Sequence, residues 1–443
     1  MLETRERALF RSVCVFAGPF SIETLQAVSQ QDDGELPDTL SSLIDSSLVR
    51  QIQVQQGSSR YAVFETIREF GLAKLIELDE GEEYRNRHAA YFARMAAGSR
   101  ALAMMTDRVY LDEQDANQKN LREGLNWLIE KGAWDDAHVM GGDLAWYWYQ
   151  CGYLLEGRRR LEQLIEASPA TIGHGPKSVA LIGLGLLVQA SGNVKEARPI
   201  LEEAVACATE AGESLVLAMA TGLLGGVLTT LGDAARAEAL FVANQHRWDT
   251  EHRDIWSGHA DFHRGLITLQ QDRIADAADR FAKALEGYDR GDGHLYAVDP
   301  LQYLGLVSLR LGDRFRANFA FGEAISRLEI RKSLPDLAMG IASVAALAER
   351  LRRYRESVIL FAAAHELRDS KSLPFPEPAA SMYLEFQRRS LAAFSQHDAV
   401  ELEKAGQELP LDAAIAAARA ILAGGTDVNV ALSQSKDSFG LTD

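Results

Sequence analysis

The chain has 443 residues, 47% of them hydrophobic and 25% charged, which gives room for two or three domains with ordinary buried cores. Its formal net charge of −17 argues against nucleic-acid binding by the bulk surface, because phosphate contacts need clustered Lys and Arg. No run of about 18 apolar residues suggests a membrane span, and the charged N-terminus does not resemble a signal peptide. Three widely separated cysteines are typical of free thiols, so we expect a cytoplasmic protein.

The first eighty residues predict three helices followed by a two-stranded wing and a fourth helix. A Gly-Pro turn at Gly18-Pro19 separates the first two helices, and Ser21 is a suitable N-cap for the second. This order of elements is that of a winged helix, which we assign to residues 1–80. The expected helices cover residues 4–15, a segment opening at Ser21, 37–46 and 66–78, and the expected strands cover 48–55 and 60–64.

The third helix of this domain is the one that enters the groove in a DNA-reading winged helix. Residues 12–49 contain no Lys or Arg, and the polar residues of the helix are acidic or hydroxylic: Asp38, Thr39, Ser41, Ser42 and Asp45. Because phosphate contacts position such a helix, we expect packing and domain coupling from this domain and no direct DNA binding by the chain.

A pattern of small and large residues then returns six times at intervals of 40 residues. Its first small residues are Ala145, Gly185, Gly225, Gly265, Gly305 and Ala345. Twelve residues later stand Gly157, Ala197, Ala237, Ala277, Ala317 and Ser357. Four residues further stand Leu161, Leu201, Phe241, Phe281, Phe321 and Phe361. A fixed period of this size predicts a solenoid of repeated units.

Each unit is expected to be two helices joined by a tight turn. Gly192, Gly232 and Gly312 supply left-handed helix ends between the two small residues, with Gly152 and Asp272 as variants. The small residues are expected where two helices cross closely. The polar residues Asn244, Arg264 and Thr268 depart from the apolar preferences of the pattern, so packing near the third and fourth units is less regular.

The spacing resembles the tetratricopeptide repeat over roughly residues 138–370, although its period of 40 exceeds the usual 34. The resemblance implies a mostly α-helical solenoid behind the winged helix. The expected parts are a helical connector with a degenerate leading repeat at 81–131, six repeats at 132–371, an irregular helical cap at 372–423 and a flexible tail or linker at 424–443.

Several segments together resemble one protein family. They are Leu9–Phe20, Leu40–Val49, Tyr61–Phe70, Arg87–Phe92, Asn120–Arg122 and Trp127-Leu128. The family is that of the bacterial STAND-class signalling ATPases that regulate transcription, often with a LuxR-type output. The resemblance implies the order nucleotide-binding domain, winged helix, tetratricopeptide repeats and DNA-binding helix-turn-helix.

The sequence departs from that family in two places. It contains no Gly-x-x-x-x-Gly-Lys-[Ser/Thr] phosphate loop, so we expect no nucleotide-binding domain and no ATP hydrolysis within these residues. Phe64-Glu65 stands where some relatives carry a phosphate-sensing His-Asp pair. At the other end, residues 438–443 resemble the opening of a LuxR-type helix-turn-helix, and an ordinary frayed tail explains them equally well.

The sequence shows no set of residues at the spacing of a catalytic or metal site. His259 and His263 are spaced i, i+4 on an expected helix, but no third or fourth ligand stands at metal spacing. We therefore expect a non-enzymatic protein without metal or cofactor.

A solenoid offers a concave surface to its partners. If the first helix of each unit lines that surface, its residues are rather apolar, which suits a peptide, a protein partner or a small effector. The alternative is that they pack against the next turn or against the N-terminal domain. The candidate groove residues are Trp146, Tyr149, Ile182, Leu186, Met219, His259, Phe262 and Gln302.

Two functional hypotheses remain open. The first is the sensor and protein-interaction module of a signal-responsive bacterial transcriptional regulator, and the second is a free-standing scaffold or adaptor with no regulatory output. The sequence names neither the effector, nor the target genes, nor the oligomeric state.

Overall fold

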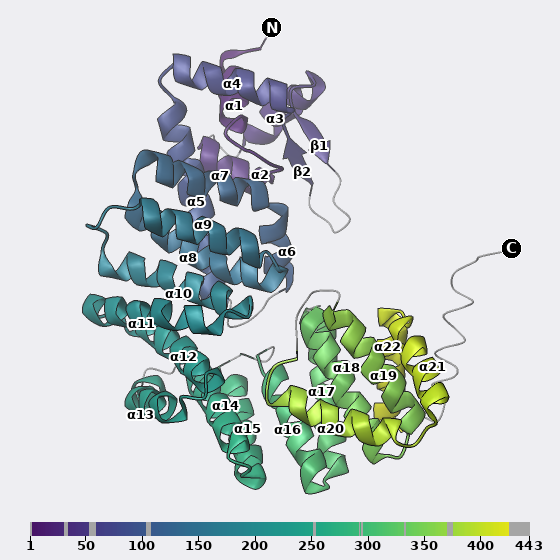
Figure 1. The fold of residues 1–443 in the computed structure, drawn as a ribbon. Helices are drawn as coiled ribbons and strands as arrows, with labels where there is room; N and C mark the ends of the chain where they lie inside the picture. Colours follow the sequence, from purple (N-terminus) through teal and green to yellow (C-terminus); the bar gives the residue numbers. More distant parts are fainter. Residues whose placement is uncertain are drawn as a thin grey trace, which may run out of the picture. The chain divides into compact units, whose positions relative to one another are not determined.

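The computed structural model describes residues 2–30, 34–52, 59–102, 108–250, 254–291, 293, 296–331, 334–369 and 375–424. Within these ranges it contains twenty-two helices and one two-stranded sheet (Figure 1). The expected fold class, a mostly α-helical solenoid with an N-terminal winged helix, is confirmed. No described helix combines the length and the apolarity that crossing a membrane requires.

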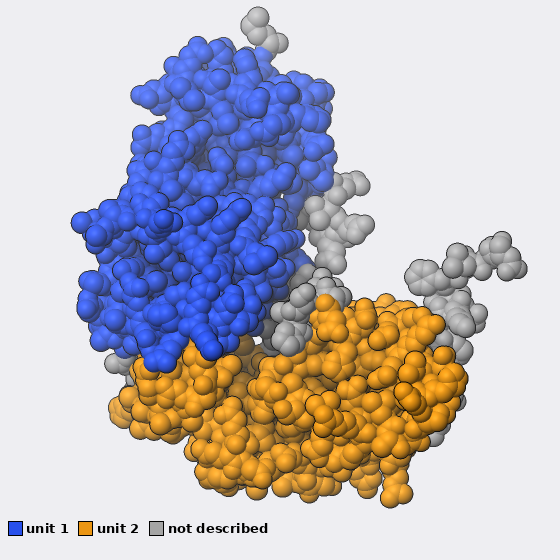
Figure 2. Space-filling view, in the orientation of Figure 1, with its two compact units in different colours: residues 1–103, 107–220 blue, residues 104–106, 221–443 orange. Residues whose placement is uncertain are grey.

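The chain divides into two compact units (Figure 2). The first comprises residues 1–103 and 107–220, and the second comprises residues 104–106 and 221–443. The division falls inside one helix of the third repeat.

The winged helix opens the first unit. Ser21 caps its second helix by accepting a hydrogen bond from the Thr24 backbone N–H at 3.2 Å, as expected. The wing strands run antiparallel with Arg50 opposite Ala62, and Phe20 forms an isolated bridge to Tyr61. The elements are α1 (Thr4–Val13), α2 (Ile22–Ser29), α3 (Leu36–Asp45), β1 (Arg50–Ile52), β2 (Arg60–Ala62) and α4 (Glu65–Glu77).

Three helices follow the winged helix: α5 (Gly81–Leu102), α6 (Arg108–Ala116) and α7 (Gln118–Lys131). The Asn120 side chain on α7 accepts a hydrogen bond from the Gly18 backbone N–H at 3.0 Å and donates one to the Pro19 carbonyl at 2.9 Å. On the wing, buried Arg60 pairs with Glu113 of α6. These contacts clamp the turn and the wing of the winged helix onto the connector, within one compact unit.

Six helix pairs follow in the described residues. Helices α8 to α13 are Trp134–Cys151, Leu154–Ala167, His174–Ala190, Val194–Ala211, Ser214–Thr230 and Ala234–Thr250. Helices α14 to α19 are Asp254–Gln270, Ile274–Arg290, Val298–Leu311, Arg314–Arg331, Leu334–Arg350 and Tyr354–Asp369. Apart from α16, which begins four residues late, the first helices start at intervals of 40 residues, in agreement with the sequence period.

The turn inside each pair contains one residue in the left-handed conformation. All four expected glycines have positive φ, and Asp272 takes the same conformation at φ 58°. The sixth turn uses Arg352, at φ 61°, a position that the sequence did not reveal. Because only Gly adopts this conformation without a steric cost, Asp272 and Arg352 are strained members of the series.

The first small residue of each repeat lies under the large residue of the second helix. A Cβ placed on Gly185 would lie 2.5 Å from Leu201 Cδ2, and one on Gly265 would lie 2.5 Å from Phe281 Cε1. Gly225 and Gly305 face Phe241 and Phe321 in the same way. At these four glycines the nearest atoms belong to the large side chain of the second helix, which fills the space that the missing Cβ leaves.

The first helices of the second, third and fifth repeats are buried on every side along their central turns. All residues of 178–188, 218–229 and 300–309 are buried, which is typical of helices enclosed by neighbouring helices. The second helices keep one face open to solvent.

After the last pair come α20 (Ala379–Leu391), α21 (Gln396–Gln407) and α22 (Leu411–Leu422), all within the segment 372–423 where an irregular helical cap was expected. Helix α21 packs on α19, where Gly406 lies against the Ile359 carbonyl and the Ala362 Cβ. Except for Gly424, the expected tail at 424–443 lies outside the described residues.

Candidate functional site

The structure divides the eight candidate groove residues between the two units. In the first unit, Trp146 on α8, Ile182 on α10 and Met219 on α12 come together around one apolar gap. Gly142, Val179 and Val216 complete its wall. The gap holds about 180 Å³ of empty space and is too narrow for a water molecule. These three residues are adjacent, as expected, but they are packed against each other.

Two further candidates lie on the same helices. Leu186 is buried on α10, and Tyr149 is half-buried near the end of α8. Neither lines the gap around Trp146. Most of the candidate residues in this unit are therefore packed against neighbouring helices, which is the alternative that the sequence left open.

In the second unit, Phe262 belongs to an aromatic cluster. Its ring centroid lies 5.9 Å from that of Phe281 and 5.7 Å from that of Tyr303. Gln302 is fully buried, and its Nε2 donates to the Asp336 carbonyl at 3.4 Å, whereas its Oε1 has no partner. These two residues are core residues of the fourth to sixth repeats.

His259 lies in a different setting, a buried polar cluster on α14. Its ring centroid is 4.5 Å from that of His263 and 5.6 Å from that of Trp256. Glycines on α12 make room for these rings, because a Cβ on Gly222 would lie 2.5 Å from Trp256 and one on Gly226 would lie 2.8 Å from His263. The glycine-rich segment of α12 is thus explained by packing.

Three ring nitrogens of the cluster are buried without a protein partner: His259 Nε2, His263 Nδ1 and Trp256 Nε1. Burial lowers the pKa of His259 to about 4, partly offset by a hydrogen bond to the Gly222 backbone. Burial, and then the neighbouring His259, lower the pKa of His263 well below its usual value. Both rings are therefore neutral at pH 7, and a ligand or partner group that bonded the three nitrogens would remove a cost of burial.

A charged pair adjoins the histidines. The Arg264 guanidinium bonds both carboxylate oxygens of Glu238 at 3.1–3.2 Å and the Gln245 Oε1 at 2.8 Å. It also lies 5.8 Å from the ring centre of Phe241. Sequence reasoning noted Arg264 only as a departure from the apolar pattern, and that departure is the signal that marks this cluster.

The cluster offers no metal centre. Among the described residues, no group of three or more His, Cys, Asp or Glu side chains could hold a metal ion. The His259–His263 pair contributes two nitrogens, whereas a closed zinc site takes four ligands.

The groove-facing helix of the winged helix, α3, is acidic on its open side. Asp38, Ser41 and Asp45 are exposed, whereas Leu40 and Leu43 are buried in the domain. The hydroxyl of Ser42 donates to Glu6 of α1. Asp38 and Asp45 are thus the charged side chains that α3 exposes to solvent.

Comparisons with known proteins agree with the N-terminal assignment. Residues 2–75 match the family model of a winged helix-turn-helix domain. Proteins of Mycobacterium tuberculosis and Mycobacterium bovis, named provisionally as HTH-type transcriptional regulators, are 27% identical over 236 residues. The match covers 51% of this chain and 26% of theirs, so the chain spans about a quarter of the length of these curated relatives.

Two solved structures give weaker likenesses. One is a STAND protein with a tetratricopeptide repeat sensor from Pyrococcus horikoshii, with a TM-score of 0.40 and 12% identity over 92% of this chain and 66% of that one. The other is BtubC from P. vanneervenii, with a TM-score of 0.25 and 14% identity over 66% of this chain and 94% of that one. At these TM-scores neither likeness bears on function.

Proposed function

We propose that this chain is the sensor and protein-interaction module of a signal-responsive transcriptional regulator of the STAND class, with a LuxR-type output. The observation that carries the proposal is the match of residues 2–75 to a winged helix-turn-helix domain, followed by six helix pairs of 40-residue period. The similarity to mycobacterial proteins named as transcriptional regulators supports the regulatory half. The tetratricopeptide-like spacing supports the interaction half.

In this proposal the chain is cytoplasmic and acts by binding, without catalysis. An effector or partner binds the inner helices, and the clamp between Asn120 and the Gly18-Pro19 turn transmits the change to the winged helix. Direct contact with DNA belongs to another part of the regulator, because the open side of α3 carries Asp38 and Asp45.

The inner helices offer two places for an effector. The apolar gap at Trp146 would have to widen before it held a ligand, since its walls are in contact. The polar cluster at His259 has three unsatisfied nitrogens, which favours a small ligand with hydrogen-bonding groups. The second place is the better candidate, because an unpaired buried donor or acceptor gains the most from a new bond.

The competing function is a free-standing scaffold. An in-frame deletion of the codons for residues 134–369 in the chromosomal gene separates the two. If the chain is the sensor of a regulator, the deletion should change the levels of a defined set of transcripts. A His263→Leu substitution should then change the same set. An unchanged transcript profile, together with loss of a co-purifying assembly, would favour the scaffold.

A further inference from the structure

The outer face of α17 exposes two phenylalanines to solvent. Phe315 and Phe319 stand four residues apart on α17 and are 86% and 63% exposed, and Leu311, the last residue of α16, is 51% exposed before the turn that leads into α17. At the register position of Phe319, the first and fourth repeats carry the exposed charged residues Arg159 and Asp279. A stripe of this kind on a soluble helix is typical of an interaction surface.

The sixth repeat shows what covers such a face. Ile359 and Ala362 of α19 stand 40 residues after Phe319 and Gly322 and occupy the same register. Helix α21 lies on them, with Gly406 against Ile359 and Ala362 and with Leu402 in the shared apolar cluster. The equivalent position on α17 is uncovered, because no atom lies within 4 Å of the Cβ position of Gly322.

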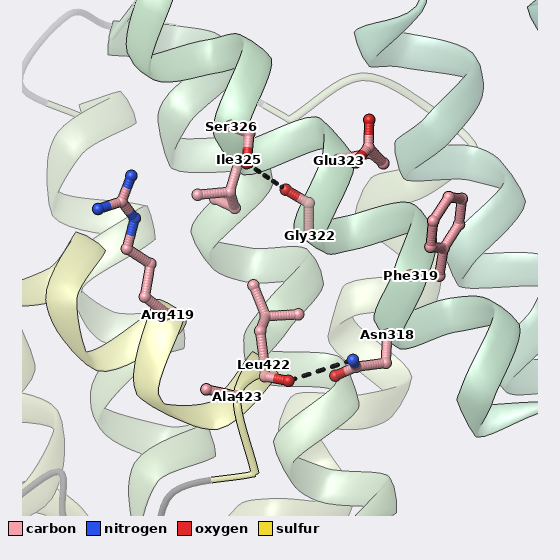
Figure 3. Close-up of a pocket in the computed structure, with 9 residues that line it drawn as sticks. All are labelled: Asn318, Phe319, Gly322, Glu323, Ile325, Ser326, Arg419, Leu422 and Ala423. Carbon is pink, nitrogen blue, oxygen red and sulfur yellow. Dashed lines mark hydrogen bonds between the residues drawn. The ribbon is translucent and has the colours of Figure 1, made fainter.

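A hollow of about 340 Å³ lies beside this stripe, between α17 and α22 (Figure 3). Phe319 and Gly322 form one wall, and Leu422 and Arg419 belong to the other. The Asn318 side chain donates to the Leu422 carbonyl at 3.2 Å and closes the base. The surface is therefore continuous with the packing of the cap helices on the last repeats.

The charged residues around Phe315 and Phe319 indicate the charge of the partner that would bind there. Arg314 and Arg316 flank Phe315 and form no ion pair with any described residue. Of the nearby carboxylates, Glu323 pairs with Arg327 and Glu329 with Arg419, and the single carboxylate of Asp313 accepts a hydrogen bond from the Arg316 backbone N–H. The uncompensated charge at the start of α17 is thus positive, although the chain as a whole is acidic.

We propose that the outer face of α17, made of Phe315, Phe319 and Gly322, together with Leu311 at the end of α16, binds an acidic amphipathic helix of a partner protein. The partner helix places a small residue and leucines against Phe319 and Gly322, as α21 does on α19. Its acidic residues meet Arg314 and Arg316. The surface is separate from the inner helices, so this inference goes beyond the proposed sensor function and does not depend on it.

The test uses two fluorescently labelled peptides with a hydrocarbon staple on the solvent side to hold them helical. The first has the sequence of residues 395–409 of this chain, the helix that covers the same register on α19. The second is its twin with Asp and Glu replaced by Lys. Binding to the intact chain is measured by fluorescence anisotropy at low salt, where charge complementarity is strongest.

We expect the acidic peptide to bind at micromolar concentration and its basic twin to bind at least about tenfold more weakly. Phe319→Glu should weaken binding of the acidic peptide by about tenfold or more, because it places a carboxylate in the apolar contact. The matched control is Leu155→Glu in the first repeat, which stands at the register of Phe315, is 79% exposed and should leave binding unchanged.

Three results would overturn the proposal. One is equal binding of the acidic peptide to the chain with and without Phe319→Glu, and another is the absence of binding by either peptide. The third is a self-interface, seen in sedimentation as a dimer of the unmodified chain that Phe319→Glu dissociates. Circular dichroism of each variant verifies that the solvent-facing substitutions leave the helices folded.

Discussion

The ring of Phe281 lies directly over Gly265, with Cε1 2.5 Å from the position that a Cβ on Gly265 would take. The two residues are 16 positions apart, on α14 and α15, and the same pairing joins Gly305 to Phe321 one repeat later. The glycine therefore makes room for a ring that is itself fully buried. This contact connects the two helices of the repeat and explains why the period appears so clearly in the sequence.

Replacing Gly265 by Leu is expected to destabilise the fourth repeat by about 1–3 kcal/mol or more, because the added side chain must displace the Phe281 ring. In a linear array the damage stays close to the affected repeat. Hydrogen exchange should show lost protection within 218–310, with protection of the winged helix retained. Unchanged protection in 218–310 would mean that the Phe281 ring does not depend on the space above Gly265.

A compensating pair gives the control for that experiment. The first repeat carries Ala145 and Leu161 at the two positions, so Gly265→Ala combined with Phe281→Leu recreates a pairing that the chain already uses. Gly265→Ala alone should cost more than the double variant, as measured by urea denaturation. Additive costs in the double variant would contradict direct contact between the two residues.

The sequence predicted the repeats well because their spacing is fixed by contacts that recur. The helix ends, the cap helices and the wing also agree with local signals such as Ser21 and the turn glycines. Arg352 was missed because nothing in its side chain favours a left-handed backbone, and the neighbouring structure imposes that conformation.

Arg352→Gly is expected to stabilise the sixth repeat by up to about 1 kcal/mol, because the left-handed conformation costs an L-residue about 1–2 kcal/mol and the more flexible unfolded glycine returns part of that gain. The opposite change at the matching position, Gly232→Ala, should destabilise the third repeat. Thermal unfolding followed by circular dichroism measures both, and a lower melting temperature for Arg352→Gly would contradict the assignment.

The polar cluster shows the limit of sequence reasoning at the site. His259 and Trp146 were both expected to line a surface, yet their rings are packed among neighbouring helices. Periodicity identifies which residues share a face of a helix, but how tightly the next repeat covers that face depends on the bulk of all the packed side chains. Ligand contact at these positions stays a prediction.

Acid is expected to destabilise the second unit before most carboxylates titrate. The folded-state pKa of His259 is about 4 and that of His263 is also lowered, whereas an unfolded histidine titrates near 6.5. The unfolded chain therefore binds more protons below about pH 6.5, so stability is full above that pH and falls as the pH drops towards 4. The neighbouring charges are the paired Arg264 and Glu238.

Between pH 7 and 5.5 His259 should lower the free energy of unfolding by about 1 kcal/mol, and His263 should change it in the same direction. Urea unfolding followed by far-ultraviolet circular dichroism measures the free energy of unfolding at each pH. Burial also lowers the pKa of His88, in the first unit, to about 3, so His88 makes the stability of that unit depend on pH in the same way. Comparison with the His263→Leu variant separates the contribution of the cluster from that of His88. An identical pH slope with and without His263 would show that the ring is already charged or solvated.

The last prediction concerns DNA and the two carboxylates of α3. We expect the purified chain to show no submicromolar binding to duplex DNA at about 0.15 M salt, where non-specific binding by basic proteins lies at roughly 10⁻⁴–10⁻⁶ M. Asp38 and Asp45 lie on the open side of the helix, where they would repel the phosphates.

Asp38→Arg combined with Asp45→Arg tests the reason, because it changes the charge of the helix by four units and leaves the buried Leu40 and Leu43 in place. The double variant should gain salt-dependent, non-specific binding in fluorescence anisotropy. The exposed pair Asp279→Arg and Glu408→Arg, elsewhere in the chain, makes the same change in net charge and should gain much less. Tight binding by the unmodified chain would mean that a basic surface other than α3 contacts DNA.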